Sequence, residues 1–264
     1  MSKVKKLILL ELEDVNLILN NSRIIRDLNL KVADEQIVGI IGSAEAGKTV
    51  LFDIISGFYK ATKGKIIFRG KNIIGMHPHE INKLGIAYVF QHNNNFSDLS
   101  VEDNIRIGLY NKISYGPLDA LLKTEMFINQ ESLLDKKIDD LLDMFDLRKY
   151  KKIPAKDLSK DLQVRLGLAR AMASSPRLLL LDNLTDSLDK NQTQDFISRI
   201  ETINRRYKTS IVITDDNIEL LSNVCSQISV MEYGMIIATD TPEVIRNNSV
   251  LRSIYSGEKL GGGF

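Results

Sequence analysis

The sequence of 264 residues predicts an α/β fold in which a helical segment interrupts a sheet domain. Short apolar runs rich in β-branched residues, such as 36–41 and 210–214, are typical of buried strands, and they alternate with segments of helical periodicity. The stretch from about 100 to 152 differs, because helical spacing of its apolar residues dominates it. We therefore expect a single domain over 1–264, with a helical subdomain at approximately 100–175 inserted into an α/β core.

The α/β pattern begins near the N-terminus. Residues 7–32 have a strand-like pattern with a turn at 20–22. A buried strand over 36–41 runs into a glycine-containing loop, and a helix from about 48 to 56 follows and ends at Gly57. Two more strands are expected before the helical segment, at 66–68 and 86–90.

The α/β pattern resumes after the helical segment. Thr241 and Pro242 suit the N-cap and the first position of a last helix, which opens a C-terminal helical tail over 241–264. Before this tail we expect helices at 162–173 and 191–207, strands at 178–181 and 210–214, and a hairpin of 227–232 with 235–239.

The composition excludes several classes of protein. A net charge of +1, from 35 Lys and Arg against 34 Asp and Glu, gives no field that would attract nucleic acid. Cys225 is the single cysteine, so the chain cannot form an intramolecular disulfide. No apolar run approaches the ~18 residues that a membrane-spanning helix needs, so we expect no direct membrane span.

A glycine-rich loop lies between the strand at 36–41 and the helix that follows it. It fits the pattern G-x-x-x-x-G-K-[ST], in which backbone N–H groups and a helix N-terminus bind phosphate. In this pattern Lys48 reaches the β- and γ-phosphates, and the Thr49 hydroxyl ligates Mg²⁺. We therefore expect a P-loop NTPase that binds ATP and Mg²⁺. The expected nucleotide-binding residues of this segment are Gly42, Ser43, Ala44, Glu45, Ala46, Gly47, Lys48, Thr49 and Val50.

Glu45 brings a carboxylate into a loop that otherwise suits polyphosphate. If its side chain points to solvent, the cost to affinity is small and screened by salt. If its position requires a positive φ, a residue other than glycine costs ~1–2 kcal/mol. We expect at most a reduced affinity, with binding retained.

Two further segments extend the nucleotide site. Residues 178–182 form an apolar strand that ends in Asp182, which would hold Mg²⁺ through water, and Ser187-Leu188-Asp189 follows. Upstream, the strand at 86–90 runs into Gln91. Together these motifs resemble those of the ABC ATPase family. The resemblance implies a RecA-like mixed sheet core with an antiparallel β subdomain and a helical subdomain. It also implies that Gln91 coordinates Mg²⁺ and senses the membrane subunit.

Within this family the sequence looks most similar to the ATP-binding subunits of branched-chain amino-acid importers. The resemblance rests on four segments: 56–60, 85–92, 116–124 and 241–248. It implies an amino-acid-type importer subunit that pairs with integral membrane permease subunits and with a second ATP-binding subunit, in a homo- or heterodimer. It also implies a cytoplasmic protein, peripheral on the inner face of the cell membrane. Subunits for urea or lipopolysaccharide transport share much of the last segment.

Two catalytic positions depart from the family pattern. The family has a glutamate, the base that activates water, directly after the aspartate that aligns with Asp182 (the Walker B aspartate), and here that position is Asn183. Because an amide cannot accept the proton, the loss costs about 10²–10⁴-fold in rate. The family also has a histidine after the next strand, and here that position is Asp215. A carboxylate at that place would repel the γ-phosphate.

The signature motif and the adenine contact depart as well. The family's L-S-G-G-Q aligns with 158–162, so Ser159 is retained, while Lys160 and Asp161 replace the glycines. A side chain and a negative charge at Asp161 oppose the close approach of a partner's γ-phosphate. The aromatic residue that stacks on adenine in the family aligns near Leu19, which allows apolar contact only.

From these departures we expect a subunit that binds Mg-ATP with weak or absent hydrolysis. No dimer containing this chain would assemble a fully standard site. One alternative is an active ATPase in which another group orients the water. Asp186 and Asp216 are the nearest spare carboxylates, although both are expected to be solvated loop residues. The other alternative is a non-transport regulatory ABC protein.

Overall fold

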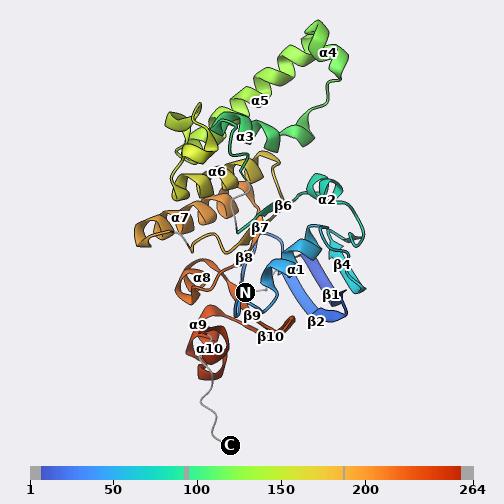
Figure 1. The fold of residues 1–264 in the computed structure, drawn as a ribbon, viewed down its shortest axis with the longest axis vertical. Helices are drawn as coiled ribbons and strands as arrows, with labels where there is room; N and C mark the ends of the chain where they lie inside the picture. The colour runs from blue at the N-terminus through green and yellow to red at the C-terminus, as the bar shows by residue number, and fades with distance from the viewer. Residues whose placement is uncertain (1–6, 92–94, 187, 257–264) are drawn as a thin grey trace, which may run out of the picture. The chain divides into compact units, whose positions relative to one another are not determined.

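A computed structural model describes residues 7–91, 95–186 and 188–256. The chain divides into two compact units. The first, here called the core unit, combines 1–91 with 177–264. The second, here called the helical unit, spans 92–176. The core unit contains every strand of both described sheets (Figure 1).

A six-stranded sheet forms the centre of the core unit. Its order is β10 (Met235–Asp240), β9 (Gln227–Glu232), β3 (Ile37–Ile41), β8 (Ser210–Thr214), β7 (Leu178–Asp182) and β6 (Ile86–Val89). Only β10 is antiparallel to its neighbour. Every residue of β3, β7 and β8 is buried, as expected for parallel strands that are covered on both faces. The carboxyl ends of these strands therefore meet at one edge, where ligands bind in open α/β sheets.

A second, antiparallel sheet has the order β2, β1, β4 and β5. Its strands are β1 (Ile8–Leu19), β2 (Ser22–Ala33), β4 (Lys63–Phe68) and β5 (Lys71–Asn72). The β1–β2 turn contains Asn20 and Asn21, with φ of 48° and 61°. Asparagine tolerates this left-handed conformation because its short side chain can hydrogen-bond locally. This sheet is the predicted antiparallel β subdomain.

The described helices of the core unit are α1 (Lys48–Ile55), α2 (Pro78–Leu84), α7 (Lys190–Tyr207), α8 (Ile218–Val224), α9 (Pro242–Asn247) and α10 (Ser249–Ser256). Helix α7 begins at a capping box, in which Asp189 accepts from the backbone N–H of Gln192 and the Gln192 side chain accepts from Asp189. Among the described residues of the whole chain, none of the helices is long and apolar enough to cross a bilayer.

The helical unit is built from α3 (Val101–Gly108), α4 (Pro117–Leu122), α5 (Glu125–Met144) and α6 (Lys160–Ala173), with three short 3₁₀ turns. Helix α5 buries Leu134, Ile138, Leu141 and Leu142, which share one face at helical spacing. Helix α3 approaches α6 closely at Gly108, because a Cβ atom there would lie 2.3 Å from the Arg170 carbonyl oxygen.

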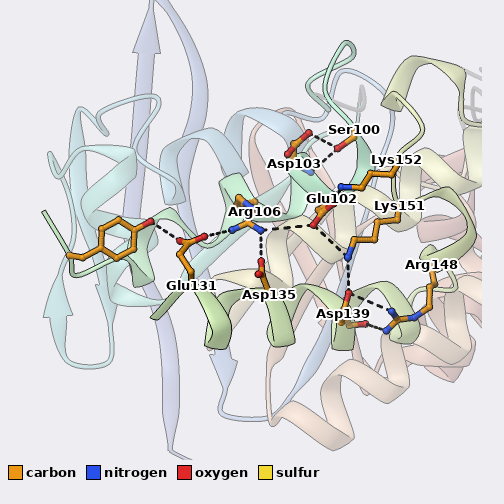
Figure 2. Close-up of polar contacts among 11 residues, drawn as sticks. Ser100, Glu102, Asp103, Arg106, Glu131, Asp135, Asp139, Arg148, Lys151 and Lys152 are labelled. Atoms are coloured by element: carbon orange, nitrogen blue, oxygen red, sulfur yellow. Dashed lines mark hydrogen bonds and ion pairs between the residues drawn. The ribbon is translucent and has the colours of Figure 1, made fainter. Parts of the chain in front are cut away.

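A network of ion pairs connects α3 to α5 and to the segment that follows α5 (Figure 2). Arg106 of α3 pairs with Glu131 across 2.9 Å and also with Asp135, both from α5. Glu102, whose side chain is only 13% exposed, pairs with Lys151 and Lys152. Because Glu102 is shielded from water and bound by several cations, we expect this network to stabilise the helical unit more than isolated surface pairs would.

Candidate functional site

The phosphate loop follows β3 and is shaped by two glycines. A Cβ atom at Gly42 would lie 2.1 Å from the carbonyl oxygen of Met231, so only glycine fits between the loop and β9. Gly47 has φ 97° and is the N-cap of α1. The backbone N–H of Gly234, in the β9–β10 turn, donates to the Ala46 carbonyl across 3.0 Å. The β9–β10 hairpin therefore packs against the phosphate loop and stabilises its conformation.

Lys48 is buried, with 7% of its surface exposed. Its ammonium donates to the carbonyl oxygens of Gly42 and Ser43 across 2.6 and 3.0 Å. It also donates to Oδ1 of Asp216, which follows β8, across 2.8 Å. The ammonium thus lies between its own loop and Asp216.

Glu45 is exposed to solvent. Its backbone φ is not positive, unlike that of several other described residues. Of the two alternatives left open by the sequence, the solvent-facing one therefore applies, and the loop carries no backbone strain at this position.

A pocket of about 440 Å³ lies over the loop and the ends of the parallel strands. It brings together most of the residues that the sequence predicted. Its lining consists of Ile24, Ala44, Glu45, Gly47, Lys48, Thr49, Val50, Gln91, Asp182, Asn183, Asp186 and Asp216. The predicted residues Gly42, Ser43 and Ala46 belong to the loop but do not line the pocket, and Leu19 packs against the core instead.

Asp182 is the buried carboxylate at the end of β7, with 1% exposure. Its Oδ1 accepts from the Thr214 hydroxyl across 2.6 Å, and its Oδ2 accepts from the Tyr88 hydroxyl across 3.0 Å. Burial, and then the charge of Asp182, raise the pKa of Tyr88. The same two causes raise the pKa of Asp53, in α1, to about 6. Asp182 is therefore fixed in orientation by two hydroxyl groups.

Asn183 follows β7 with a φ of 43°. Its backbone N–H donates to the Thr214 carbonyl across 2.8 Å. Its Nδ2 donates to Oδ2 of Asp186 across 2.7 Å, and Gln91 Nε2 approaches the same oxygen at 3.4 Å. Its Oδ1 is buried and has no hydrogen-bond partner among the described residues. The Asn183 side chain is thus held in place by Asp186, while its Oδ1 makes no hydrogen bond to the described residues.

Asp215 is buried and is not among the residues that line the pocket. Its Oδ2 accepts from the Thr185 hydroxyl across 2.5 Å, and its Oδ1 accepts from the Asn217 backbone N–H across 2.8 Å. Burial raises the pKa of Asp215 to about 6. The carboxylate expected to meet a γ-phosphate is thus engaged elsewhere, and its neighbour Asp216 faces the pocket instead.

Known proteins are similar to this chain over most of its length. A model of the ABC transporter family matches residues 25–186, more than half of the chain. The chain belongs to the ABC transporter family. The high-affinity branched-chain amino acid transport ATP-binding protein LivG of Escherichia coli K12 is 30% identical over 234 residues, which cover 89% of this chain and 92% of LivG. The lipopolysaccharide export system ATP-binding protein LptB of Haemophilus influenzae is 29% identical over 238 residues, covering 90% and 92%.

The fold agrees with this family assignment. The crystal structure of the ADP conformation of MJ1267, an ATP-binding cassette of an ABC transporter, matches with a TM-score of 0.83. The two chains are 22% identical, and the match covers 96% of this chain and 100% of MJ1267. The predicted fold, an α/β P-loop NTPase of ABC type, is confirmed.

A nucleotide and Mg²⁺ fit the site of this ABC protein. Helix α1 has no acidic residue in its first turn, so its N-terminus keeps its partial positive charge toward the loop. The oxygen-bearing side chains of Thr49, Gln91 and Asp182 line the same pocket, and Mg²⁺ prefers oxygen ligands. Each carboxylate oxygen of Asp182 accepts one hydrogen bond from a side chain and has a further lone pair.

The residues predicted to form the signature motif lie at the start of α6 in the helical unit. Ser159 is the N-cap, but its side chain does not cap the helix. Instead its hydroxyl donates to Oδ1 of Asp161 across 2.5 Å, while Asp161 also lies 3.7 Å from Arg165. Lys160 is exposed. The Ser159 hydroxyl is therefore engaged with the Asp161 carboxylate within the same turn of chain.

The sequence named some residues of this site only as spare carboxylates and did not predict others. Asp186 and Asp216 are exposed, as expected of solvated loop residues, and both also line the pocket. Tyr88 and Thr214 hold Asp182, and their positions near the ends of strands β6 and β8 are the signal that could have revealed them. Ser187 and His92, from the predicted motifs, lie outside the described residues.

Proposed function

We propose that this chain is the ATP-binding subunit of an amino-acid-type ABC importer, that it binds Mg-ATP, and that it hydrolyses ATP weakly or not at all. The similarity to LivG, named as a branched-chain amino acid transport protein, supports the substrate class. In this proposal, residues 1–264 form a single ABC domain with a helical subdomain at about 100–175 and a helical tail at 241–264.

The proposal gives each retained residue a role in binding. The loop backbone from Gly42 to Thr49 would surround the phosphates, with Lys48 as the cation. Thr49, Gln91 and Asp182 would hold Mg²⁺, which supplies charge neutralisation when it is bound. Ile24 lines the pocket where Leu19 does not, so an apolar contact with a base would come from Ile24.

The position of Asn183 carries the claim of weak hydrolysis. Its side chain lines the pocket directly after Asp182, and its amide cannot take a proton from water. Two other carboxylates near this position, those of Asp215 and Asp216, are already engaged. Asp215 accepts from Thr185, and Asp216 pairs with Lys48. The chain therefore retains the means of binding nucleotide and lacks a free base at the expected place.

One observation favours a second candidate, an active ATPase. Asp186 lines the pocket and is exposed, and it accepts from Asn183. In that arrangement Asp186 would take the place of the missing base, with Asn183 positioning it. The carboxylate would then have to accept a proton from water while holding the Asn183 amide.

The ATPase rates of three variants distinguish the two candidate functions. Asn183→Glu should raise the ATPase rate by about 10²–10⁴-fold if the base alone is missing, whereas Asn183→Gln, the matched control, should not. Asp186→Asn should leave the low rate unchanged under the main proposal and abolish it under the alternative. The main proposal would be overturned if Asp186→Asn abolished the wild-type ATPase rate and Asn183→Glu did not raise it.

The transport role is tested separately. We propose integral membrane permease subunits and a second ATP-binding subunit as partners, and a cytoplasmic location, peripheral on the inner face of the cell membrane. Affinity purification of the full chain from its own membranes should recover hydrophobic permease subunits in a stoichiometric complex. Recovery of the chain without them, from membranes that contain the complex's expected partners, would contradict the transport role.

A further inference from the structure

The hydrogen-bonding capacity of the Lys48 ammonium is fully used within the chain. An ammonium group has three N–H donors. Two of them donate to the backbone carbonyls of Gly42 and Ser43, and the third donates to the carboxylate of Asp216. A phosphate oxygen can therefore bind Lys48 only by displacing one of these three acceptors.

Asp216 is the acceptor that gives way most easily. Its side chain is 51% exposed, so water solvates its charge as soon as the ion pair opens. The Gly42 carbonyl, in contrast, belongs to a buried residue at the start of the loop. An anion that enters the pocket consequently exchanges with Asp216 and leaves the carbonyl contacts in place.

The exchange does not treat all nucleotides alike. In a phosphate loop the lysine reaches the β- and γ-phosphates, so the carboxylate of Asp216 lies on the cation that the terminal phosphates use. We propose that Asp216 is a specificity-determining residue, which substitutes for a terminal phosphate at Lys48 and so weakens triphosphate binding more than diphosphate or monophosphate binding. This proposal rests on the nucleotide-binding function given above.

The charge of the pocket as a whole is a separate effect that the test must exclude. Among the described lining residues, four carboxylates, those of Glu45, Asp182, Asp186 and Asp216, stand against one cation, Lys48. Any of them would repel an anionic ligand over a distance that salt limits. Asp186 is the matched control, because it lines the same pocket but, among the described residues, hydrogen-bonds to Asn183 and Gln91 and not to Lys48.

The test is equilibrium binding of ATP, ADP and AMP to the full chain, by titration calorimetry with EDTA present and again with Mg²⁺. Wild type, Asp216→Asn and Asp186→Asn are compared at one ionic strength. We expect Asp216→Asn to bind ATP about fivefold more tightly, the size typical of a half-exposed ion pair. The gain should be smaller for ADP and absent for AMP, and Asp186→Asn should give a smaller, unselective gain.

Equal gains for the three nucleotides, equal gains for the two variants, or no gain for Asp216→Asn would overturn the proposal. Asp216→Ser, checked for folding by circular dichroism, provides a second variant with the carboxylate removed. If wild type and Asp216→Asn both fail to bind any nucleotide, the proposed nucleotide-binding function falls, and this inference falls with it. If wild type binds ATP and both Asp216 variants bind it equally well, only this inference falls.

Discussion

The side-chain amide of Asn183 donates from Nδ2 to a carboxylate oxygen of Asp186 across 2.7 Å. This bond turns the amide's donor side toward the spare carboxylate and leaves Oδ1 buried without a protein partner among the described residues. A buried acceptor without a partner is costly unless water or a ligand supplies a donor. At this ABC site, Asn183 is therefore held by Asp186, and its amide cannot take a proton from a water molecule.

The first prediction concerns Gly42. In Gly42→Ala the new methyl group would lie 2.1 Å from the Met231 carbonyl oxygen, so the loop or β9 must move. We expect a loss of about 1–3 kcal/mol in the free energy of unfolding and a strong loss of ATP affinity. Chemical denaturation and nucleotide titration measure these two quantities.

Gly70→Ala is the control for this prediction. Gly70 has φ +77°, and no atom lies within 4 Å of a Cβ atom there. Its substitution should cost about 1 kcal/mol from the left-handed backbone alone and leave ATP affinity unchanged. Unchanged ATP affinity in Gly42→Ala would show that the loop does not bind phosphate in the way described.

The second prediction is a pH dependence at Asp53. Its pKa is raised from 3.8 to about 6, by burial and then by the charge of Asp182. Between these pH values the folded state binds more protons than the unfolded state, so the contribution of Asp53 to stability falls as pH rises. Asp53→Asn should therefore stabilise the protein by about 1–2 kcal/mol at pH 7.5, and the gain should vanish near pH 4.

Asp98→Asn is the sign control for that measurement. Lys156 lowers the pKa of Asp98, so its carboxylate stabilises the fold at neutral pH and stops doing so in acid. The two variants should thus move the free energy of unfolding in opposite directions at pH 7.5. A destabilised Asp53→Asn at that pH would contradict the assignment of a buried carboxylate beside Asp182.

The third prediction concerns the ion network of the helical unit (Figure 2). Glu102→Gln removes the charge that Lys151 and Lys152 share, at a side chain only 13% exposed. We expect a loss of about 1–3 kcal/mol in the free energy of unfolding, because Lys151 and Lys152 lose the carboxylate of a largely buried side chain. Hydrogen exchange of the α3 and α5 amides measures this loss locally.

The exposed pair of Asp98 with Lys156 serves for comparison, since both side chains are more than half exposed. Breaking it with Asp98→Asn should change the exchange rates little, because surface ion pairs contribute about 0–1 kcal/mol. Equal effects of the two substitutions would show that the network is no stronger than a surface pair.

Much of the fold could be predicted because its signals are local. The parallel strands β7 and β8 are nearly continuous apolar runs. The glycine-rich loop between a strand and a helix can be predicted from the spacing of its residues. Helix α6 begins at Lys160, two residues before its predicted start, because the altered signature residues themselves form its first turn.

The path of the loops after the strands could not be predicted. Two adjacent carboxylates follow β8, and the sequence does not show that Asp215 turns inward to Thr185 while Asp216 reaches Lys48. The hydroxyl of Tyr88 on Asp182 joins residues far apart in the chain, which only the pairing of β6 with β7 brings together. Such contacts depend on tertiary geometry, so residue spacing along the chain does not contain them.

The central claim is that this ABC subunit holds ATP without splitting it efficiently. The most direct measurement is the steady-state ATPase rate of the purified full chain at saturating Mg-ATP, beside equilibrium ATP binding and a Lys48→Ala control. We predict clear ATP binding and a turnover far below the ~1 s⁻¹ at the lower end of ordinary enzymes. A turnover of about 1 s⁻¹ or more that Lys48→Ala abolishes would contradict the claim.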